Sequence, residues 1–383
     1  MEDTQSGAQP KIPSLDGVRG LAIALVFFVH YSVAWTMLFP AAANDATLTG
    51  VIADAAFSVG NAGVDLFICL SGYLIYDHLM RKPQRLRTYL ARRARRIFPP
   101  YLVVLCIYVL LMLIDPRKSK LPANPLHAVA YILECALLIP NFFGHEPIVG
   151  IAWSLTYEML FYLVLPLMIF AGRLRSRSPM TRTAMLLGLS ALVLAITWRV
   201  QFYERIVMFA GGMIARDTLV YWKYRLPRPR IVEVLACAAV ALALGYMAAF
   251  RGAVPFTNPV FPQTYHRAVF LFVGFSSILA VTLGTKGVLR RIFEFAPLRR
   301  LGEVSYSFYL LHNLVMRIAL GFLMPRVAVG IATPAFWLAM PIAFALCLGS
   351  GLIFFCAVEF PFSVRRRSVA VRNTQSIEWR PTQ

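Results

Sequence analysis

Apolar runs of about 20 residues recur along this chain, and no other feature of the sequence restricts its fold as strongly. A helix of that length crosses the roughly 30 Å hydrocarbon core of a membrane. The sequence therefore predicts an all-α integral membrane protein with about ten transmembrane helices. The runs lie at 17–39, 60–80, 98–114, 151–171, 183–200, 203–222, 231–249, 267–285, 304–323 and 334–358.

The composition agrees with a membrane protein. Charged residues make up only 15% of the 383 residues and hydrophobic residues 59%, whereas a soluble domain carries about 25% charged residues. The formal net charge is +20, and the basic residues lie in short clusters between the apolar runs, as the positive-inside rule describes. The charge therefore indicates membrane topology and contact with membrane lipids, and no nucleic-acid partner is expected. The six cysteines form no CxxC pair, so no metal site is predicted.

One apolar segment, 126–140, is short for a crossing helix. If it crossed the membrane, Arg173, Arg175 and Arg177 would lie on the outer side. If it is a re-entrant or half-crossing element, the main basic clusters stay together on the inner side. We therefore expect such an element, with both termini in the cytoplasm.

The spans divide the chain into three expected parts, with no separate soluble domain. Residues 1–13 form a polar cytoplasmic tail, 14–363 a membrane domain, and 364–383 a basic, disordered cytoplasmic tail. The first apolar segment carries Arg19 and His30, which a secretory signal would avoid. We therefore expect it to be retained as the first helix.

Ionisable residues inside these spans each cost about 2.5–3.5 kcal/mol on insertion scales, which makes them functional candidates. Arg19 and His30 stand eleven positions apart in the first span, and eleven steps of about 100° return close to the same helix face. The rise of roughly 16 Å places Arg19 near the cytoplasmic surface and His30 past the midplane. Asp65 in the second span needs a cation, and His30 and Arg19 are the expected choices.

The segment 81–96 is dense in arginine. Arg92 with Arg95, and Arg93 with Arg96, form two pairs at i, i+3. Two guanidinium groups on one helix face can bind a phosphate in a bidentate manner. Anchoring by the positive-inside rule also explains a basic loop, but the excess of arginine over lysine favours a phosphorylated ligand.

Later spans carry further polar side chains. Glu158 follows Trp153 in the fourth span, where a carboxylate could orient a sugar hydroxyl or stabilise a helix contact. Ser305 and His312 are seven positions apart and share a face of the ninth span. For His312 a structural and a functional interpretation both remain open.

Taken in chain order, these segments resemble the membrane acyltransferase-3 family. Arg19 and His30 reproduce its pattern of an arginine, ten residues and a histidine, while Tyr157 departs from the acidic or small residue usual before the glutamate. The matching motifs run from residue 14 to 363. They are Ser14-Leu15-Asp16-Gly17-Val18-Arg19-Gly20 with His30; Gly63-Val64-Asp65-Leu66-Phe67 with Leu70-Ser71-Gly72-Tyr73; the arginine-rich segment with Pro99 and Tyr101; Trp153-Ser154-Leu155 with Glu158; Ser305-Tyr306-Ser307 with His312; and Val358-Glu359-Phe360-Pro361.

The resemblance implies a ten-helix enzyme of the bacterial cytoplasmic (inner) membrane. Such enzymes transfer an acyl group, usually acetyl, from acyl-CoA to a hydroxyl of a glycan or lipid-linked sugar. The resemblance assigns catalysis to His30, with Arg19 as its partner. It assigns the phosphates of coenzyme A to Arg92, Arg93, Arg95 and Arg96. Six further polar residues of the motifs are expected to have substrate-binding or structural roles, and they are Ser71, Trp153, Glu158, Ser305, Tyr306 and His312.

A mechanism follows as an expectation. His30 acts as general base on the acceptor hydroxyl, and Asp65 fixes the imidazole tautomer. Arg19 either holds a phosphate of coenzyme A or polarises the donor. The identity of the glycan and the choice between acetyl and succinyl remain open.

Two other functions also remain open. A transporter or flippase of a polar metabolite needs polar helices around a midplane site as well, but it would neither bind nor hydrolyse acetyl-CoA. An acyltransferase that acts on a small molecule or a lipid is the other alternative.

Overall fold

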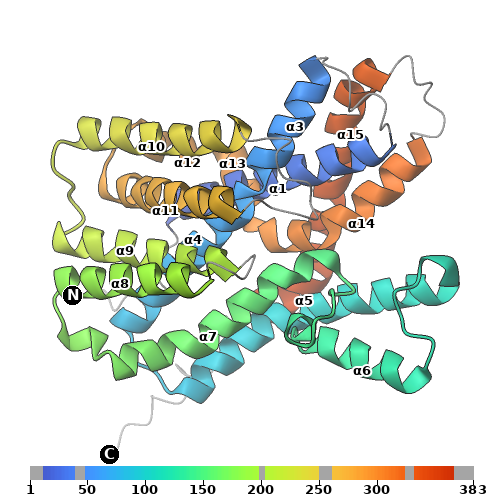
Figure 1. Cartoon of the computed structure of the whole chain (residues 1–383), viewed down its shortest axis with the longest axis horizontal. Coiled ribbons are helices and arrows are strands. Elements are labelled where there is room, and N and C mark those ends of the chain that lie inside the picture. Colours follow the sequence, from blue (N-terminus) through green and yellow to red (C-terminus); the bar gives the residue numbers. More distant parts are fainter. Residues whose placement is uncertain (1–11, 39–47, 198–202, 250–260, 324–331, 366–383) are drawn as a thin grey trace, which may run out of the picture.

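The computed structural model describes residues 12–38, 48–197, 203–249, 261–323 and 332–365, and within these residues every regular element is helical. The prediction of an all-α membrane protein is confirmed (Figure 1). Most of the tails expected at 1–13 and 364–383 lies outside the described residues. The helices are α1 (Pro13–Leu38), α3 (Leu48–Gly60), α4 (Ala62–Arg81), α5 (Leu86–Ile114), α6 (Pro125–Ala136), α7 (Trp153–Ala171), α8 (Pro179–Thr197), α9 (Val207–Tyr221), α10 (Pro229–Ala249), α11 (Phe261–Gly284), α12 (Val288–Phe293), α13 (Ala296–Glu303), α14 (Ser305–Leu323) and α15 (Ala332–Phe354), followed by the π-helical η8 (Phe355–Arg365).

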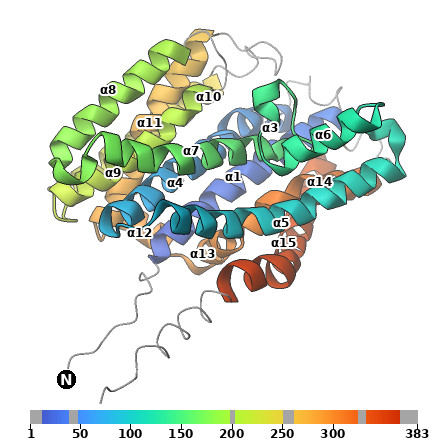
Figure 2. The same ribbon diagram turned by 90° about the horizontal axis from the view of Figure 1, so that it is seen from below.

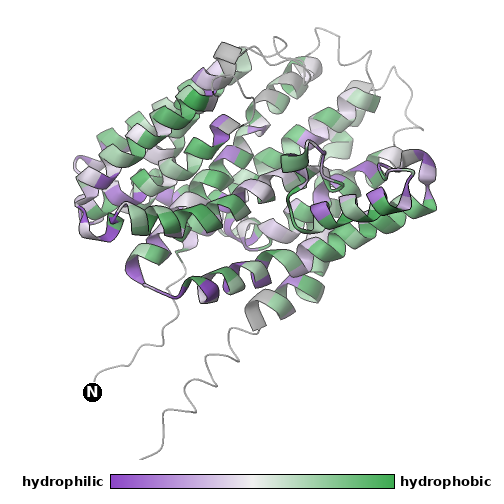
Figure 3. Cartoon of the chain, turned by 60° about the horizontal axis from the view of Figure 1, so that its bottom comes forward, coloured by the Kyte–Doolittle hydropathy of each residue, from purple (hydrophilic) through white to green (hydrophobic). Residues whose placement is uncertain are grey.

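Each of the ten predicted spans contains one of the long helices. Eight helical stretches of the described residues are long and apolar enough to cross a membrane, and α9 and α14 occupy the other two predicted spans. The ends of two predicted spans, at 39 and 198–200, lie outside the described residues. Figure 3 shows apolar residues over most helix surfaces and hydrophilic residues gathered at several helix ends.

The segment expected to be re-entrant forms α6. Its 12 residues give a length of about 18 Å, which is less than the roughly 30 Å of hydrocarbon core. Asn124 caps the helix by accepting hydrogen bonds from the N–H groups of Leu126 and His127. Figures 1 and 2 show α6 folding back beside the end of α5, after which the chain enters α7. Helices α5 and α7 therefore run in opposite directions.

Helix α1 lies at the centre of the molecule, in contact with α3, α4, α12, α13, α14 and α15 (Figure 2). Glycine permits the closest of these contacts. A Cβ atom at Gly20 would stand 2.0 Å from the carbonyl oxygen of Leu298, and one at Gly302 would stand 1.7 Å from that of Asp16. Because backbones approach this closely, the polar face of α1 is held against protein.

Candidate active site

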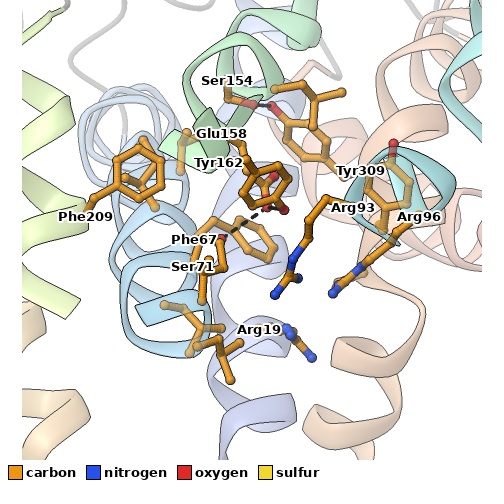
Figure 4. Close-up of a pocket in the computed structure, with 18 residues that line it drawn as sticks. Arg19, Phe67, Ser71, Arg93, Arg96, Ser154, Glu158, Tyr162, Phe209 and Tyr309 are labelled. Atoms are coloured by element: carbon orange, nitrogen blue, oxygen red, sulfur yellow. Dashed lines mark hydrogen bonds between the residues drawn. The ribbon is translucent and has the colours of Figure 1, made fainter. Parts of the chain in front are cut away.

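A cavity of about 110 Å³ lies among α1, α4, α5, α7, α9 and α14 (Figure 4). Each of these helices contributes at least one side chain to its wall, so distant parts of the sequence meet there. Its polar lining consists of Arg19, Ser71, Arg93, Arg96, Ser154, Glu158, Tyr162, Ser305, Tyr306 and Tyr309.

Three guanidinium groups point into the same space, and they belong to Arg19, Arg93 and Arg96 (Figure 4). The arginine-rich segment forms the first turns of α5, and the helix directs its side chains to different surroundings. Arg93 and Arg96 are partly buried at the cavity, whereas Arg92 and Arg95 are exposed. The structure thus separates the two predicted pairs and brings one of them to Arg19.

Neighbouring side chains hold two of these cations, Arg19 and Arg93, in place. Arg19 donates a hydrogen bond of 3.0 Å to the carboxylate of Asp16, one turn earlier on α1. The guanidinium of Arg93 lies 5.3 Å from the ring centroid of Tyr162 and 5.7 Å from that of Tyr89. Stacking on aromatic faces leaves the edge N–H groups of an arginine free to bind an anion.

Glu158 is the carboxylate in the cavity lining. The hydroxyl of Tyr162 donates to Glu158, and that of Ser71 lies 3.5 Å from the same oxygen. The lining therefore carries three cations and one anion. Such a site attracts a ligand with several negative charges, because the excess charge is partly buried and weakly screened.

Ser154 and Tyr309 form a second polar group in the cavity lining (Figure 4). Their hydroxyl oxygens are 2.8 Å apart, and Tyr309 donates to the carbonyl of Ile151 at 2.8 Å. The hydroxyl of Tyr306 donates to the carbonyl of Ile97, which ties α14 to α5. These bonds tie α14 to α7 and to α5 at the cavity wall.

His30 is not among the residues that line this cavity. Its Nδ1 lies 2.8 Å from the carbonyl oxygen of Val26, and a carbonyl only accepts, so Nδ1 carries the hydrogen. The lone pair of the neutral ring is therefore on Nε2, as a general base requires. Two ring contacts connect the cavity lining to His30. The ring centroid of Tyr309, which lines the cavity, is 5.7 Å from that of His312, and the centroid of His312 is 4.7 Å from that of His30.

The expected pairing of Asp65 with His30 or Arg19 is wrong. One oxygen of Asp65 accepts a hydrogen bond of 3.0 Å from Arg267 on α11, and the other lies 3.8 Å from Arg205 on the short 3₁₀ helix before α9. The His30 tautomer is set instead by the carbonyl of Val26 on its own helix. Asp65 neutralises cations, but they are not the predicted ones.

Trp153 belongs to the surroundings of Asp65. The guanidinium of Arg205 lies 5.3 Å from its ring centroid.

Ser305, by contrast, lines the cavity with Tyr306. Of the predicted residues, the cavity thus collects seven, while the others stand apart from it. The seven are Arg19, Ser71, Arg93, Arg96, Glu158, Ser305 and Tyr306.

Several residues were missed by the sequence interpretation. Tyr162 and Tyr309 lie one turn from predicted residues, at i+4 from Glu158 and Ser305, and this spacing could have identified them. Arg205 and Arg216-Asp217 are ionisable residues within the predicted span 203–222. The insertion cost that singled out Asp65 applies to them as well.

Arg216 and Asp217 belong to a buried ion network between α4, α8 and α9. Asp217 accepts two hydrogen bonds of 2.8 Å from Arg182 and one of 2.9 Å from Arg216, which also donates to Asp77. Asp77 in turn accepts from Arg81 at the end of α4. The network lies at the ends of these helices that face the basic loops, and it links the three helices.

Among the described residues, no group of three or more histidine, cysteine, aspartate or glutamate side chains could hold a metal ion. The polar groups of the cavity are arginines, hydroxyls and one carboxylate. Their chemistry suits an anionic organic ligand.

A family described as "Acyltransferase domain" matches residues 12–358. Curated relatives include the peptidoglycan O-acetyltransferase OatA of Listeria monocytogenes, 23% identical over 82% of this chain and 50% of its own length. The putative peptidoglycan O-acetyltransferase YrhL of Bacillus subtilis is 25% identical over 85% of this chain and 51% of its own. The putative membrane-bound transacylase BcsY of Komagataeibacter xylinus is 27% identical over 78% and 71%. The chain spans about half the length of the first two relatives, and no solved structure matches it.

Proposed function

This chain belongs to the acyltransferase family that matches residues 12–358, and from that premise we propose that it is a membrane O-acyltransferase. The donor is acyl-CoA bound from the cytoplasm, and acetyl is the group transferred. The acceptor is a hydroxyl of a glycan or a lipid-linked sugar. The relatives named as peptidoglycan O-acetyltransferases support a glycan acceptor. The enzyme acts in the bacterial inner membrane, with both termini in the cytoplasm.

The convergence of Arg19, Arg93 and Arg96 on one cavity is the observation that carries this proposal. Coenzyme A is a polyanion, and arginine binds phosphate through charge-assisted, often bidentate hydrogen bonds. A cavity of about 110 Å³ is smaller than coenzyme A, so it receives only part of the donor. We place phosphate groups at the arginines, with the pantetheine arm and the thioester extending away from them, past Tyr309 and Ser154.

His30 supplies the base in this scheme. The hydroxyl of the acceptor gives its proton to Nε2 of His30, and its oxygen attacks the thioester carbonyl. The carbon–sulfur bond then breaks, and the thiol leaves with the proton returned by the imidazole. One ester and one free coenzyme A thiol result. Because His30 does not line the cavity that receives the donor, we place the approach of the acceptor on the other side of His30, toward the outside.

Thiol release from acetyl-CoA by the purified protein tests the proposal against the transport alternative. The acyltransferase binds acetyl-CoA with saturation, and it releases coenzyme A faster when an extract of cell-wall glycan is added. A transporter or flippase leaves the thioester intact in both conditions. Absence of binding and of release in a folded, detergent-solubilised protein would refute the proposed function.

A further inference from the structure

His312 is the buried titratable group that the proposed reaction has not used. It lies on α14, is fully buried, and its ring centroid stands 4.7 Å from that of His30 with the rings at 83°. Its Nδ1 lies 2.7 Å from the carbonyl oxygen of Tyr309. By the argument used for His30, Nδ1 carries the hydrogen and the lone pair is on Nε2.

That Nε2 atom is buried and has no hydrogen-bond partner among the described residues. A buried polar atom without a partner is costly to a protein and calls for an explanation. The ring also has tight surroundings, with Phe308 stacked beside it at 5.9 Å and the carbonyl of His312 accepting from the thiol of Cys347. The ring of His312 is thus packed edge to face against that of His30.

The need for such a lone pair arises during the reaction. His30 in its neutral form satisfies its single N–H through Val26. When Nε2 of His30 takes the proton of the acceptor, the ring becomes a cation with a second N–H in a poorly solvated site. That N–H faces the acceptor oxygen and then the departing sulfur, so it is the charge of the ring that needs stabilisation in this site. The lone pair of the neutral ring beside it supplies the negative end of a dipole.

We infer that His312 is a positioning residue for the acyl transfer, whose Nε2 lone pair stabilises and orients the imidazolium that forms on His30. The inference rests on the proposed function. His312 itself gains and loses no proton, because the proton that reaches His30 returns to the departing thiolate. The two histidines together therefore carry one transferred proton at a time, and that proton is on His30.

No other group named here around His30 and His312 offers a free lone pair to the imidazolium. Arg317 of α14 is the cation whose charge reaches His30, and a cation cannot accept a hydrogen bond. Tyr309 of α14 contacts His312, but its hydroxyl is engaged with Ile151 and Ser154. From α15, Cys347 donates to the backbone of His312.

Three substitutions of His312 distinguish the contribution of Nε2 from that of Nδ1. His312→Gln places an amide at the position of Nε2, His312→Asn keeps only a mimic of Nδ1, and His312→Phe keeps the ring shape with neither nitrogen. We expect kcat for acetyl transfer to fall on the order of 100-fold in the Asn and Phe variants, as when one group that stabilises developing charge is removed. The Gln variant recovers most of this loss, and the KM for acetyl-CoA stays unchanged in all three.

A merely structural histidine gives a different result. In that case kcat tracks the amount of folded protein, and Phe, which removes an unpaired polar atom, performs at least as well as Gln. Native kcat in His312→Phe, or equal losses in Gln and Phe, overturns the inference.

The native protein separates this outcome from a failure of the proposed function. If native protein releases no thiol from acetyl-CoA, both fail together. If native protein transfers acetyl and His312→Phe does so equally well, only the role of His312 fails.

Discussion

Four arginines stand close together on α5, at positions 92, 93, 95 and 96, and the helix gives them unequal surroundings. Arg93 and Arg96 lie at the cavity with Arg19, while Arg92 and Arg95 are exposed. Identical side chains within one turn thus serve different purposes. A group in the cavity is desolvated and aimed at a ligand, whereas an exposed arginine interacts with water and lipid headgroups.

The pair Arg93 and Arg92 tests this difference. Arg93→Ala should weaken acetyl-CoA binding by about 10- to 100-fold, because a charged hydrogen bond contributes about 1.5–3 kcal/mol. Arg92→Ala, the matched control, should change the Kd by less than about threefold. Isothermal titration calorimetry on purified protein measures both. Equal losses in the two variants would show that the donor does not bind in this cavity.

For Asp65 the sequence predicted the need for a cation but not which cation it is. The sequence marked it as a carboxylate in need of a cation, and that is correct. Its partners are Arg267, 202 positions away, and Arg205. Apolar periodicity reports which residues enter the membrane, but it does not report which helices become neighbours. The prediction considered only the cations of the first span, His30 and Arg19, and these are not the partners.

Substitution of Asp65 should act on stability. Asp65→Asn removes the carboxylate that pairs with Arg267 and Arg205, and removing one partner of a buried ion pair costs about 3–5 kcal/mol. We expect a lower unfolding temperature in detergent and a partial recovery in the double variant Asp65→Asn, Arg267→Gln. An Asp65→Asn protein with native stability and strongly reduced kcat would instead restore Asp65 to the catalytic step.

At the scale of the helix, the crossing of α4 and α9 depends on two glycines. A Cβ atom at Gly72 would stand 2.1 Å from the carbonyl oxygen of Phe209, and one at Gly212 would stand 1.9 Å from that of Cys69. Small residues permit such backbone contact between membrane helices. Gly72 adjoins Ser71, and Phe209 lines the cavity, so the crossing also sets the width of the site.

Gly72→Ala should therefore push the two helices apart. We expect a loss of about 1–3 kcal/mol, as for overpacking elsewhere, together with reduced activity. Gly188→Ala on α8 is the control, because among the described residues no atom outside its own stretch of helix lies within 4 Å of its added Cβ. Thermal unfolding of the two variants in one detergent compares them. Equal stability of both would mean that α4 and α9 do not touch at Gly72.

The helices themselves were more predictable than their contacts. Every predicted span contains a helix, since apolar length alone selects it. The start of α5 at Leu86 rather than at 98 was not predicted, because polar residues extend a helix beyond the hydrocarbon core without a signal in hydropathy. The short α13 was missed for the same reason: the sequence Ala296–Glu303 is too polar and too brief to be read as a span.

At the scale of the whole molecule, α6 decides the topology. It turns back beside α5 without the length to cross, so the loop between α7 and α8 lies on the same side as Arg85 at the start of α5. This arrangement collects the basic clusters on one face, as the positive-inside rule requires. It also places the arginines of the cavity toward that face.

Cysteine accessibility in whole cells tests this topology. In a background without native cysteines, Ser119→Cys in the α5–α6 connection should react with an impermeant maleimide from outside. Ser176→Cys in the α7–α8 connection should react only after the membrane is permeabilised, as should the control Arg85→Cys. If Ser176→Cys reacts in intact cells, then α6 crosses the membrane and the basic clusters do not share a side.

The central claim is that a donor bound at the three arginines reacts at His30. It is tested most directly by following the acetyl group of labelled acetyl-CoA, supplied at the cytoplasmic face of membrane vesicles, into the glycan. We predict that native protein labels the glycan and that His30→Ala binds acetyl-CoA with native affinity yet labels none above background. Near-native labelling by His30→Ala would contradict the account.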